Sequence, residues 1–152
     1  MNYKISKVLK KIGNYIPILE PYLYKILRDK SPMSKGEEYI ANWLKINDIK
    51  YKSEYLIKTK EIVKHKIFMF ADFYLPKYNT IIEYNGRQYY EFTPFFHKTE
   101  EDFKLQQKRD KYLEDYCKSK GMHLIVVSYK VRYKDFNNFL WKQLSQKMQK
   151  VK

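Results

Sequence analysis

The sequence predicts an α/β domain with a mixed sheet flanked by helices, and two patterns support this fold class. Three β-prone segments lie between residues 49 and 84 with short connections, which makes consecutive strands antiparallel neighbours. A continuous apolar run at 122–128 follows a long helical pattern, as is typical of a strand covered on both faces that can pair in parallel. The 152 residues therefore suit one compact domain, with a basic helical extension at 1–30 and the domain proper at 31–152.

The N-terminal extension has a helical pattern that breakers interrupt. Apolar residues recur there at roughly helical spacing, at Ile5, Val8, Leu9 and Ile12. Gly13, Pro17 and Pro21 interrupt the pattern, so we expect two or three short helices rather than one. The extension could grip DNA, dimerise and so make a homodimer, or cap the domain, and the sequence does not choose among these.

The first helix of the domain begins with a capping signal. Ser34 is a good N-cap residue, and Glu37 three residues later completes a capping box. Glu37 also shares a face with Ile40 and Leu44, at i, i+3 and i+7. Two interpretations of Glu37 follow: it caps the first turn, or it faces the edge of the sheet beside a site. The helix is expected to end near Asn47.

Three strands are expected next, joined by a charged hairpin loop and a turn. Residues 49–57 alternate loosely and predict the first strand, and the charged residues 58–66 predict the hairpin loop. Residues 67–75 and 80–84 are rich in aromatic and β-branched side chains, which favours the second and third strands. Residues 76–80 contain Pro and Asn and predict the turn between them.

Each of the last two of these strands carries one carboxylate in apolar surroundings. Asp72 lies among aromatic and aliphatic residues, and Glu83 follows two isoleucines. A carboxylate there is costly unless a partner stabilises its charge, and a divalent cation would do so for both. The alternative interpretation is that both acids point to solvent from a half-exposed hairpin. Asn85 and Gly86 favour a site, because they predict a tight bend with polar side chains directly after Glu83.

The second half of the domain is expected to add a helix, a strand and a last, basic helix, which completes the order αβββαβα. The long helix spans about 100–120 and stops at Gly121, and the last helix spans 134–149. Asp110 shares a face of the long helix with Cys117, which we expect to pack as a small buried hydrophobe. Asp110 either pairs with a neighbouring Lys or Arg or holds a catalytic group in place.

The net charge of +14 is concentrated at both ends of the chain. Residues 1–30 hold seven basic and two acidic side chains, and residues 121–152 hold seven and one, whereas the centre is nearly balanced. Basic flanks suit a polyanionic partner such as DNA; an anionic membrane surface and generic solubility are the alternatives. One cysteine and the lack of a long apolar run predict a cytoplasmic protein (in the host if viral) without disulfide, signal peptide or membrane span.

Four motifs together are similar to one known superfamily. They are D-F-Y-L-P-x-Y-N from Asp72, I-E-Y-N-G-x-Q around Glu83, S-x-G-E-x-x-I-x-x-x-L from Ser34, and D-x-x-x-x-x-Y-C from Asp110. The set resembles the PD-(D/E)XK nucleases, and most of all their Vsr-like branch with its phage-type and homing-type endonucleases. This resemblance implies a restriction-endonuclease-like αβββαβ core and an endonuclease that cuts DNA with Mg²⁺ or Mn²⁺. It also implies that Asp72 and Glu83 bind the metal, that Glu37 assists, and that Asp110 positions a catalytic group.

The residues around Glu83 depart from the superfamily in one respect. Its name promises a lysine two residues after the acid, where this chain has Asn85, whose amide can only orient water or phosphate through hydrogen bonds. Gln88 matches a later polar position and could share that work, while Tyr89 stands where relatives of this type often have His. The backbone carbonyl of Tyr84 is a candidate further ligand for the metal.

Basic residues elsewhere could replace the missing lysine or contact DNA, and the candidates are Lys66, Arg87, Lys104 and Lys108. His97 is expected to be a surface residue of a loop, and no small-molecule cofactor is expected. The leading hypothesis is therefore a metal-dependent DNA endonuclease. The alternative is a catalytically inactive nucleic-acid-binding or structural module on the same fold.

Overall fold

The computed structural model describes residues 33–63, 66–87, 90 and 99–149. The chain divides into two compact units, Met1–Met33 and Ser34–Lys152, and the described residues lie almost entirely in the second. The predicted helical extension at 1–30 lies outside the described residues, as do Gln88, Tyr89 and His97.

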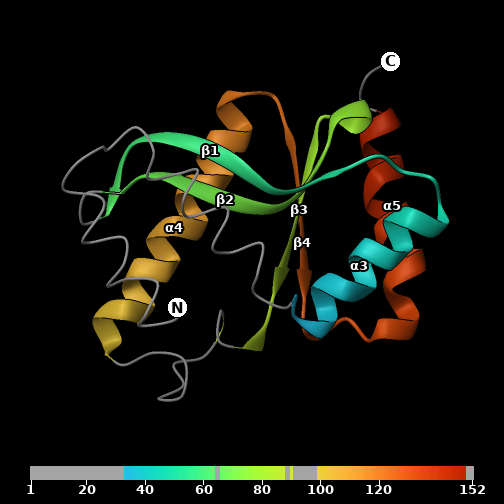
Figure 1. Cartoon of the computed structure of the whole chain (residues 1–152), viewed down its shortest axis with the longest axis horizontal. Helices are drawn as coiled ribbons and strands as arrows, with labels where there is room; N and C mark the ends of the chain where they lie inside the picture. The colour runs from blue at the N-terminus through green and yellow to red at the C-terminus, as the bar shows by residue number, and fades with distance from the viewer. Residues whose placement is uncertain (1–32, 64–65, 88–89, 91–98, 150–152) are drawn as a thin grey trace. The chain divides into compact units, whose positions relative to one another are not determined.

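The described residues form a mixed α/β unit whose elements follow the predicted order (Figure 1). In chain order these are α3 (Lys35–Ile46), β1 (Lys52–Val63), β2 (Lys66–Leu75), β3 (Thr80–Asn85), α4 (Glu100–Ser119), β4 (His123–Ser128) and α5 (Phe136–Gln149). Two short 3-10 helices, η1 (Pro76–Tyr78) and η3 (Tyr133–Asp135), precede β3 and α5. The predicted α/β class and the order αβββαβα are thus confirmed for this unit.

The four strands form one mixed sheet in the order β1-β2-β3-β4. β2 is antiparallel to both β1 and β3, as short connections require. β4 enters from α4 and runs parallel to β3, with Ile82 opposite Ile125. The prediction that the last strand pairs in parallel with a strand of the hairpin set is therefore confirmed.

The predicted hairpin loop at 58–66 is wrong for residues 58–63 and 66, because these belong to the strands. β1 extends to Val63 and β2 begins at Lys66, and these two residues face each other in the ladder. The charges suggested a loop, but pairing with a partner strand overrides weak local propensity. The first strand also begins at Lys52 rather than Ile49, whose side chain is buried beside the end of α3.

Helices cover both faces of the sheet and divide the core into two parts (Figure 1). On one face, α3 and α5 bring residues such as Leu44 and Leu140 against Phe73 and Ile82. On the other face, Leu113 and Cys117 of α4 pack against the sheet. Cys117 is buried, as the sequence predicts. β4 lies at the edge of the sheet, and only one of its faces is fully buried: Ile125 and Val127 are buried, whereas Val126 is 39% exposed, so the predicted cover on both faces is only partial.

At Asp72, the apolar side chains of β2 switch from one face of the sheet to the other. Ala71 belongs to the core beneath α4, whereas Phe73 belongs to the core beneath α3 and α5, although residues two apart normally share a face. The β1–β2 ladder skips one position there, between the pairs Tyr55–Ala71 and Ser53–Phe73. Opposite the gap, Glu54 of β1 has a φ of 48°, which is unusual in a strand. A local twist in both strands therefore surrounds Asp72.

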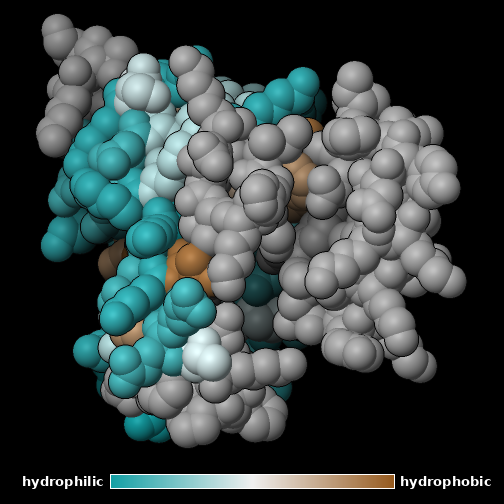
Figure 2. Space-filling model, turned by 90° about the vertical axis from the view of Figure 1, so that its left-hand side faces the viewer, coloured by the Kyte–Doolittle hydropathy of each residue, from teal (hydrophilic) through white to brown (hydrophobic). Residues whose placement is uncertain are grey.

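The helix ends follow the predicted signals. The hydroxyl of Ser34 accepts a hydrogen bond from Glu37 N and caps α3, and Gly121 with a φ of 61° follows the last turn of α4. In the part of the chain that the structure describes, no helix combines the length and apolar character needed to cross a membrane. Figure 2 shows one side of the molecule, where the described surface is mainly hydrophilic with small hydrophobic patches.

Candidate active site

Asp72 and Glu83 come together where β2 and β3 separate, a point that we call the fork. The ladder between the two strands ends at the pair Phe73–Ile82, and Figure 1 shows the strands diverging beyond it. Past that pair, side chains replace the backbone pairing. Asp72 N donates to Glu83 Oε1 at 3.0 Å, and Tyr84 N donates to Asp72 Oδ2 at 2.8 Å. Each carboxylate therefore accepts a hydrogen bond from the backbone of the opposite strand.

Both acids are buried, so neither points freely to solvent from the hairpin. Asp72 is 8% exposed and Glu83 is 5% exposed. Burial raises the pKa of the Glu83 carboxyl well above its ordinary value, and the nearby charge of Asp72 raises it further. The positive charge of Arg109 and the hydrogen bond from Asp72 N act in the opposite direction. The fork thus brings two buried acidic groups together, where it is costly for both to be charged, as the sequence predicted.

Arg109 supplies the positive charge at the fork. It lies on α4, and its Nη2 donates to Phe70 O at 2.8 Å, two residues before Asp72 on β2. Sequence reasoning missed Arg109 as the cation of the site, because its neighbours Lys104 and Lys108 carry the same charge on the same helix. Those two lysines and Arg87 are exposed, whereas Arg109 is partly buried. A signal was present: Arg109 directly precedes Asp110, which the sequence had already placed on the inner face of α4.

Asp110 lies near enough to affect Glu83. Its negative charge contributes to the raised pKa of Glu83. Burial raises the pKa of the Asp110 carboxyl itself to about 6, against the opposing effect of Arg109. Of the neighbouring cations considered as partners for Asp110, Lys111 pairs instead with Glu114 and Asp115, at 3.4 and 3.1 Å, whereas the charge of Arg109 does act on Asp110. The structure therefore places Asp110 beside the fork, and the pKa of its carboxyl group lies close to neutral pH.

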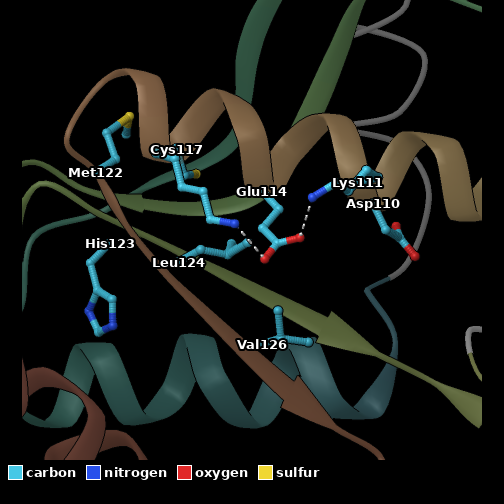
Figure 3. Close-up of a pocket in the computed structure, with 9 residues that line it drawn as sticks. Asp110, Lys111, Glu114, Cys117, Met122, His123, Leu124 and Val126 are labelled. Atoms are coloured by element: carbon cyan, nitrogen blue, oxygen red, sulfur yellow. Dashed lines mark hydrogen bonds and ion pairs between the residues drawn. The ribbon is translucent and has the colours of Figure 1, made fainter.

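A pocket of about 570 Å³ lies between α4 and β4 and includes Asp110. Figure 3 shows Asp110 at one end of the pocket and Met122 and His123 at the other. Leu124 and Val126 of β4 form an apolar floor opposite the charged side chains of α4. Because Asp110 also acts on Glu83, one end of the pocket approaches the fork.

Glu37 lies with the phenol of Tyr84. Besides its cap contact, Glu37 Oε1 accepts a hydrogen bond from the Ser34 hydroxyl at 2.8 Å. The Tyr84 ring belongs to the core beneath α3, and a Cβ on Gly36 would overlap it. Burial, a hydrogen bond with Tyr133 and the charge of Glu37 raise the pKa of Tyr84 to about 12. The capping interpretation of Glu37 is therefore confirmed. Glu83, between Ile82 and Tyr84 in the strand, points to the other face, so among the described residues Glu37 lies with Ser34 and Tyr84 rather than with the carboxylate pair.

The backbone of Tyr84 and Asn85 forms the remaining wall of the fork. Tyr84 N–H faces Asp72, and Asn85 O accepts from Tyr129 N on the β4 side at 2.8 Å. Since the N–H and C=O of one residue in a strand point to the same neighbour, the Tyr84 carbonyl is directed to the β2 side, where the carboxylates lie. Asn85 is partly buried at the end of β3. Gln88, which the sequence grouped with Asn85, lies outside the described residues.

The oxygen donors at the fork fit a hard divalent cation. Among the described residues, no group of three or more His, Cys, Asp and Glu side chains is arranged to hold a metal ion. Mg²⁺ does not require such a group, since it usually keeps several waters and binds through one or two carboxylates. Asp72, Glu83 and the Tyr84 carbonyl supply that kind of donor set. A bound cation would also relieve the repulsion between the two buried carboxylates.

Comparisons with known proteins find similarity to viral proteins across slightly less than half of the chain. Uncharacterized protein 307L of Invertebrate iridescent virus 6 is 42% identical over 73 residues, which cover 48% of this chain and 36% of that protein. Uncharacterized protein 033L of Invertebrate iridescent virus 3 is 37% identical over 73 residues, covering 48% and 38%. Uncharacterized protein 094L of Frog virus 3 (isolate Goorha) is 42% identical over 74 residues, covering 48% and 46%.

This chain thus matches less than half of the length of these curated relatives, and their names state no activity. No protein-family model matches the chain. No solved structure matches it either.

Proposed function

We propose that this protein is a metal-dependent endonuclease that hydrolyses DNA phosphodiester bonds at the fork. One observation carries the proposal: two buried carboxylates from adjacent strands share a small space with Arg109, and their charges repel each other. Perturbed acids beside a cation are typical of catalytic sites. The resemblance of the surrounding motifs to PD-(D/E)XK nucleases, with their restriction-endonuclease-like fold, supports the same reaction.

The residues of the fork divide the work of hydrolysis among them. Asp72, Glu83 and the Tyr84 carbonyl would hold Mg²⁺ or Mn²⁺, which supplies neutralisation of phosphate charge and activation of water. Arg109 would bind a phosphate oxygen and so supply a positive charge that Asn85, in the place of the expected lysine, cannot supply. Asp110, with a pKa of about 6, would accept and return a proton near neutral pH. The Asn85 amide would orient the phosphate or the attacking water.

DNA binding would depend on exposed cations around the site. Lys104 and Lys108 are exposed on α4, five residues and one residue before Arg109, and Arg87 is exposed just beyond β3. Such side chains contact phosphates without reading sequence. Affinity should therefore fall steeply with salt, in keeping with the net charge of +14.

A cleavage panel tests the proposal directly. Supercoiled plasmid, linear duplex, single strand and four-way junction are each incubated with Mg²⁺, Mn²⁺ or a chelator. Asp72→Asn and Glu83→Gln should each reduce metal-dependent cutting by about a hundredfold or more, because either change removes an anionic ligand. Asp115→Asn, which removes an exposed acid of α4, serves as the control and should cut normally. Unchanged cutting by either site variant would refute the site.

The second candidate function is a catalytically inactive module that binds nucleic acid or has a structural role. The observation in its favour is that each carboxylate already accepts a backbone hydrogen bond across the fork, as a structural acid would. Asn85 in place of a lysine points the same way. This alternative predicts salt-sensitive DNA binding and no cleavage with any divalent ion. It also predicts that divalent ions shift the melting temperature of the wild type and of Asp72→Asn equally, or shift neither.

A further inference from the structure

Exposed tyrosines gather at the carboxyl ends of β3 and β4. Tyr39, Tyr90 and Tyr133 are 48%, 43% and 39% exposed, and Tyr129 lies against Tyr90. We refer to these four residues as the tyrosine surface. They come from α3, from the segment after β3, from the segment after β4, and from η3. Such exposure of large rings in one region calls for an explanation, because exposed apolar area that gathers often marks a binding site.

Two of these rings form a rigid platform. Tyr39 and Tyr133 stack with ring centroids 4.2 Å apart and an angle of 3° between the planes. Both rings contact the edge of Phe136, which is buried, at 6.2 and 5.5 Å between centroids. The platform is therefore preformed, and a further flat ring could extend the stack without reordering it.

The other two rings carry a cation. The centroids of Tyr90 and Tyr129 are 5.7 Å apart, and Lys130 Nζ lies 5.6 Å from the first and 6.0 Å from the second. Arg132 and Lys134 follow within four residues and are exposed, although Arg132 pairs with Asp135 at 2.8 Å. Aromatic faces thus alternate with positive charges along residues 129–134.

This alternation matches the chemistry of an unpaired nucleic-acid strand. Bases stack on aromatic side chains in a sequence-tolerant way, while cations contact the phosphates between them. Double-stranded DNA keeps its base faces inside the stack and offers phosphates and groove edges instead. Glu37 and Glu38 at the start of α3 oppose an anion near Tyr39, so the phosphates would lie along Lys130 and Lys134.

The tyrosine surface is joined to the fork by two direct contacts. The phenol of Tyr84 forms a hydrogen bond with Tyr133, and the backbone N–H of Tyr84 binds Asp72. Asn85 O accepts from Tyr129 N. Tyr84 and Asn85 of β3 therefore connect the tyrosine surface to the fork through the strand, although the Tyr84 ring and the Glu83 carboxylate point to opposite faces of the sheet.

We propose that the tyrosine surface binds an unpaired segment of DNA by stacking of bases on Tyr133 and Tyr90, with phosphates on Lys130 and Lys134. The part of this inference that concerns cleavage rests on the proposed function: the substrate would be DNA with a single-stranded segment beside the bond that is cut. The binding part stands without it.

Fluorescence anisotropy in the presence of a chelator tests binding alone. The probes are a labelled twelve-nucleotide oligothymidine and a duplex of the same length, at matched salt. We expect tighter binding to the single strand. Tyr133→Leu and Tyr90→Leu should each weaken it by about fivefold to a hundredfold, whereas Tyr133→Phe, which keeps the ring, should bind as the wild type does.

A matched control lies at the opposite end of the sheet. Lys77 Nζ lies 5.6 Å from the ring of Tyr78, the same separation as between Lys130 and Tyr90, but η1 places this pair away from the fork. Tyr78→Leu should leave binding unchanged, and melting curves verify that each variant is folded. Equal binding by Tyr133→Leu and the wild type, an equal loss in Tyr78→Leu, or tighter binding to duplex would each overturn the proposal. Ring-dependent binding to anionic lipid vesicles but not to the oligonucleotide would overturn it as well.

The two proposals fail separately. If the protein binds the single strand through its tyrosines in the presence of a chelator, but cuts no DNA with any metal, the endonuclease proposal fails and the proposal for the tyrosine surface stands. If plasmid and duplex are cut but the tyrosine variants bind and cut all substrates like the wild type, the surface proposal fails alone.

Discussion

The β2–β3 hairpin contains two neighbouring regions with the same burial and opposite chemistry. Nearest the turn, Phe73 and Leu75 face Ile82 and Thr80 in a regular ladder, and all four side chains are 0% or 1% exposed. One position farther along, the carboxylates at the fork are nearly as buried, but the ladder has stopped. The two regions are adjacent in the chain and in space.

The difference between them distinguishes side chains that stabilise the fold from charged side chains that the fold positions at a cost in stability. Burial of hydrocarbon stabilises by roughly 25 cal/mol per Å². Burial of a carboxylate costs free energy unless hydrogen bonds or opposite charge offset it, and the fork offers two backbone N–H groups and Arg109. The apolar region therefore stabilises the hairpin, while the fork retains charge at the expense of stability, as functional sites often do.

The largest effect is expected in the apolar region. Phe73→Ala should lower the free energy of unfolding by about 3–5 kcal/mol, because it removes a buried ring from the core beneath α3 and α5. Urea unfolding followed by circular dichroism measures the change. Val126→Ala, at a half-exposed position of β4, is the control and should cost less than about 1 kcal/mol. If the two variants lose similar stability, the apolar region does not anchor the hairpin.

The next effect concerns the helix that supports Tyr84. Gly36→Ala should destabilise by about 1–3 kcal/mol, because the new methyl group would overlap the Tyr84 ring. Tyr84 also binds Asp72 through its N–H, so cleavage should fall with stability. Asn42→Ala, on the exposed side of the same helix, should be neutral or slightly stabilising in the same unfolding measurement. A stable Gly36→Ala protein would show that the ring moves aside freely.

The fork itself should respond to pH in the opposite sense to an ordinary surface acid. The folded protein holds the Glu83 proton more tightly than the unfolded chain does, so stability falls as pH rises above the ordinary value of 4.5. Without added metal, Glu83→Gln should therefore gain stability relative to the wild type at pH 8 and not at pH 4. The gain should be smaller than the losses above, since the amide oxygen still accepts from Asp72 N. Thermal melts across this pH range provide the measurement, and a variant less stable than the wild type at pH 8 would contradict it.

The smallest effect is expected at Asp110. Because its pKa is raised to about 6, the protonated carboxyl stabilises the folded state at low pH. This stability is lost as pH rises from about 4 to 6 and the folded state gives up its proton. Two pKa units correspond to about 2.7 kcal/mol, and screening by solvent at this partly exposed position reduces that to about 1 kcal/mol. Asp110→Asn should thus gain about 1 kcal/mol at pH 7 and nothing at pH 3.5. Asp115→Asn should show no such gain, because Asp115 lies on the exposed side of α4.

Local signals in the sequence were sufficient for the helix ends and for the face of α4. Ser34, Gly121 and Cys117 do what short-range patterns predict, because caps and helical periodicity depend on neighbours within one or two turns. The pairing of Asp72 with Glu83 was also foreseeable, since a short turn places them opposite each other. The extension of β1 to Val63 and the start of β2 at Lys66 were not, because each depends on pairing with the other strand rather than on neighbours within its own segment.

Contacts between distant segments lay beyond the reach of sequence reasoning. Arg109 meets the fork because α4 crosses β2, and many other cations on that helix were equal candidates. The change of face at Asp72 depends on a twist shared with Glu54. The tyrosine surface brings together residues from four separate segments, and no motif unites them.

By itself, the sequence determined the order of elements, the presence of two carboxylates on adjacent strands, and the excess of positive charge. Only the tertiary structure decided that each carboxylate accepts a hydrogen bond from the backbone of the opposite strand, that Arg109 is the cation beside them, and that Glu37 lies near the Tyr84 phenol. The physical reason is range: propensity and periodicity act between near neighbours in the chain, whereas the electrostatic environment of a buried acid is set by whichever distant groups packing brings within a few ångströms.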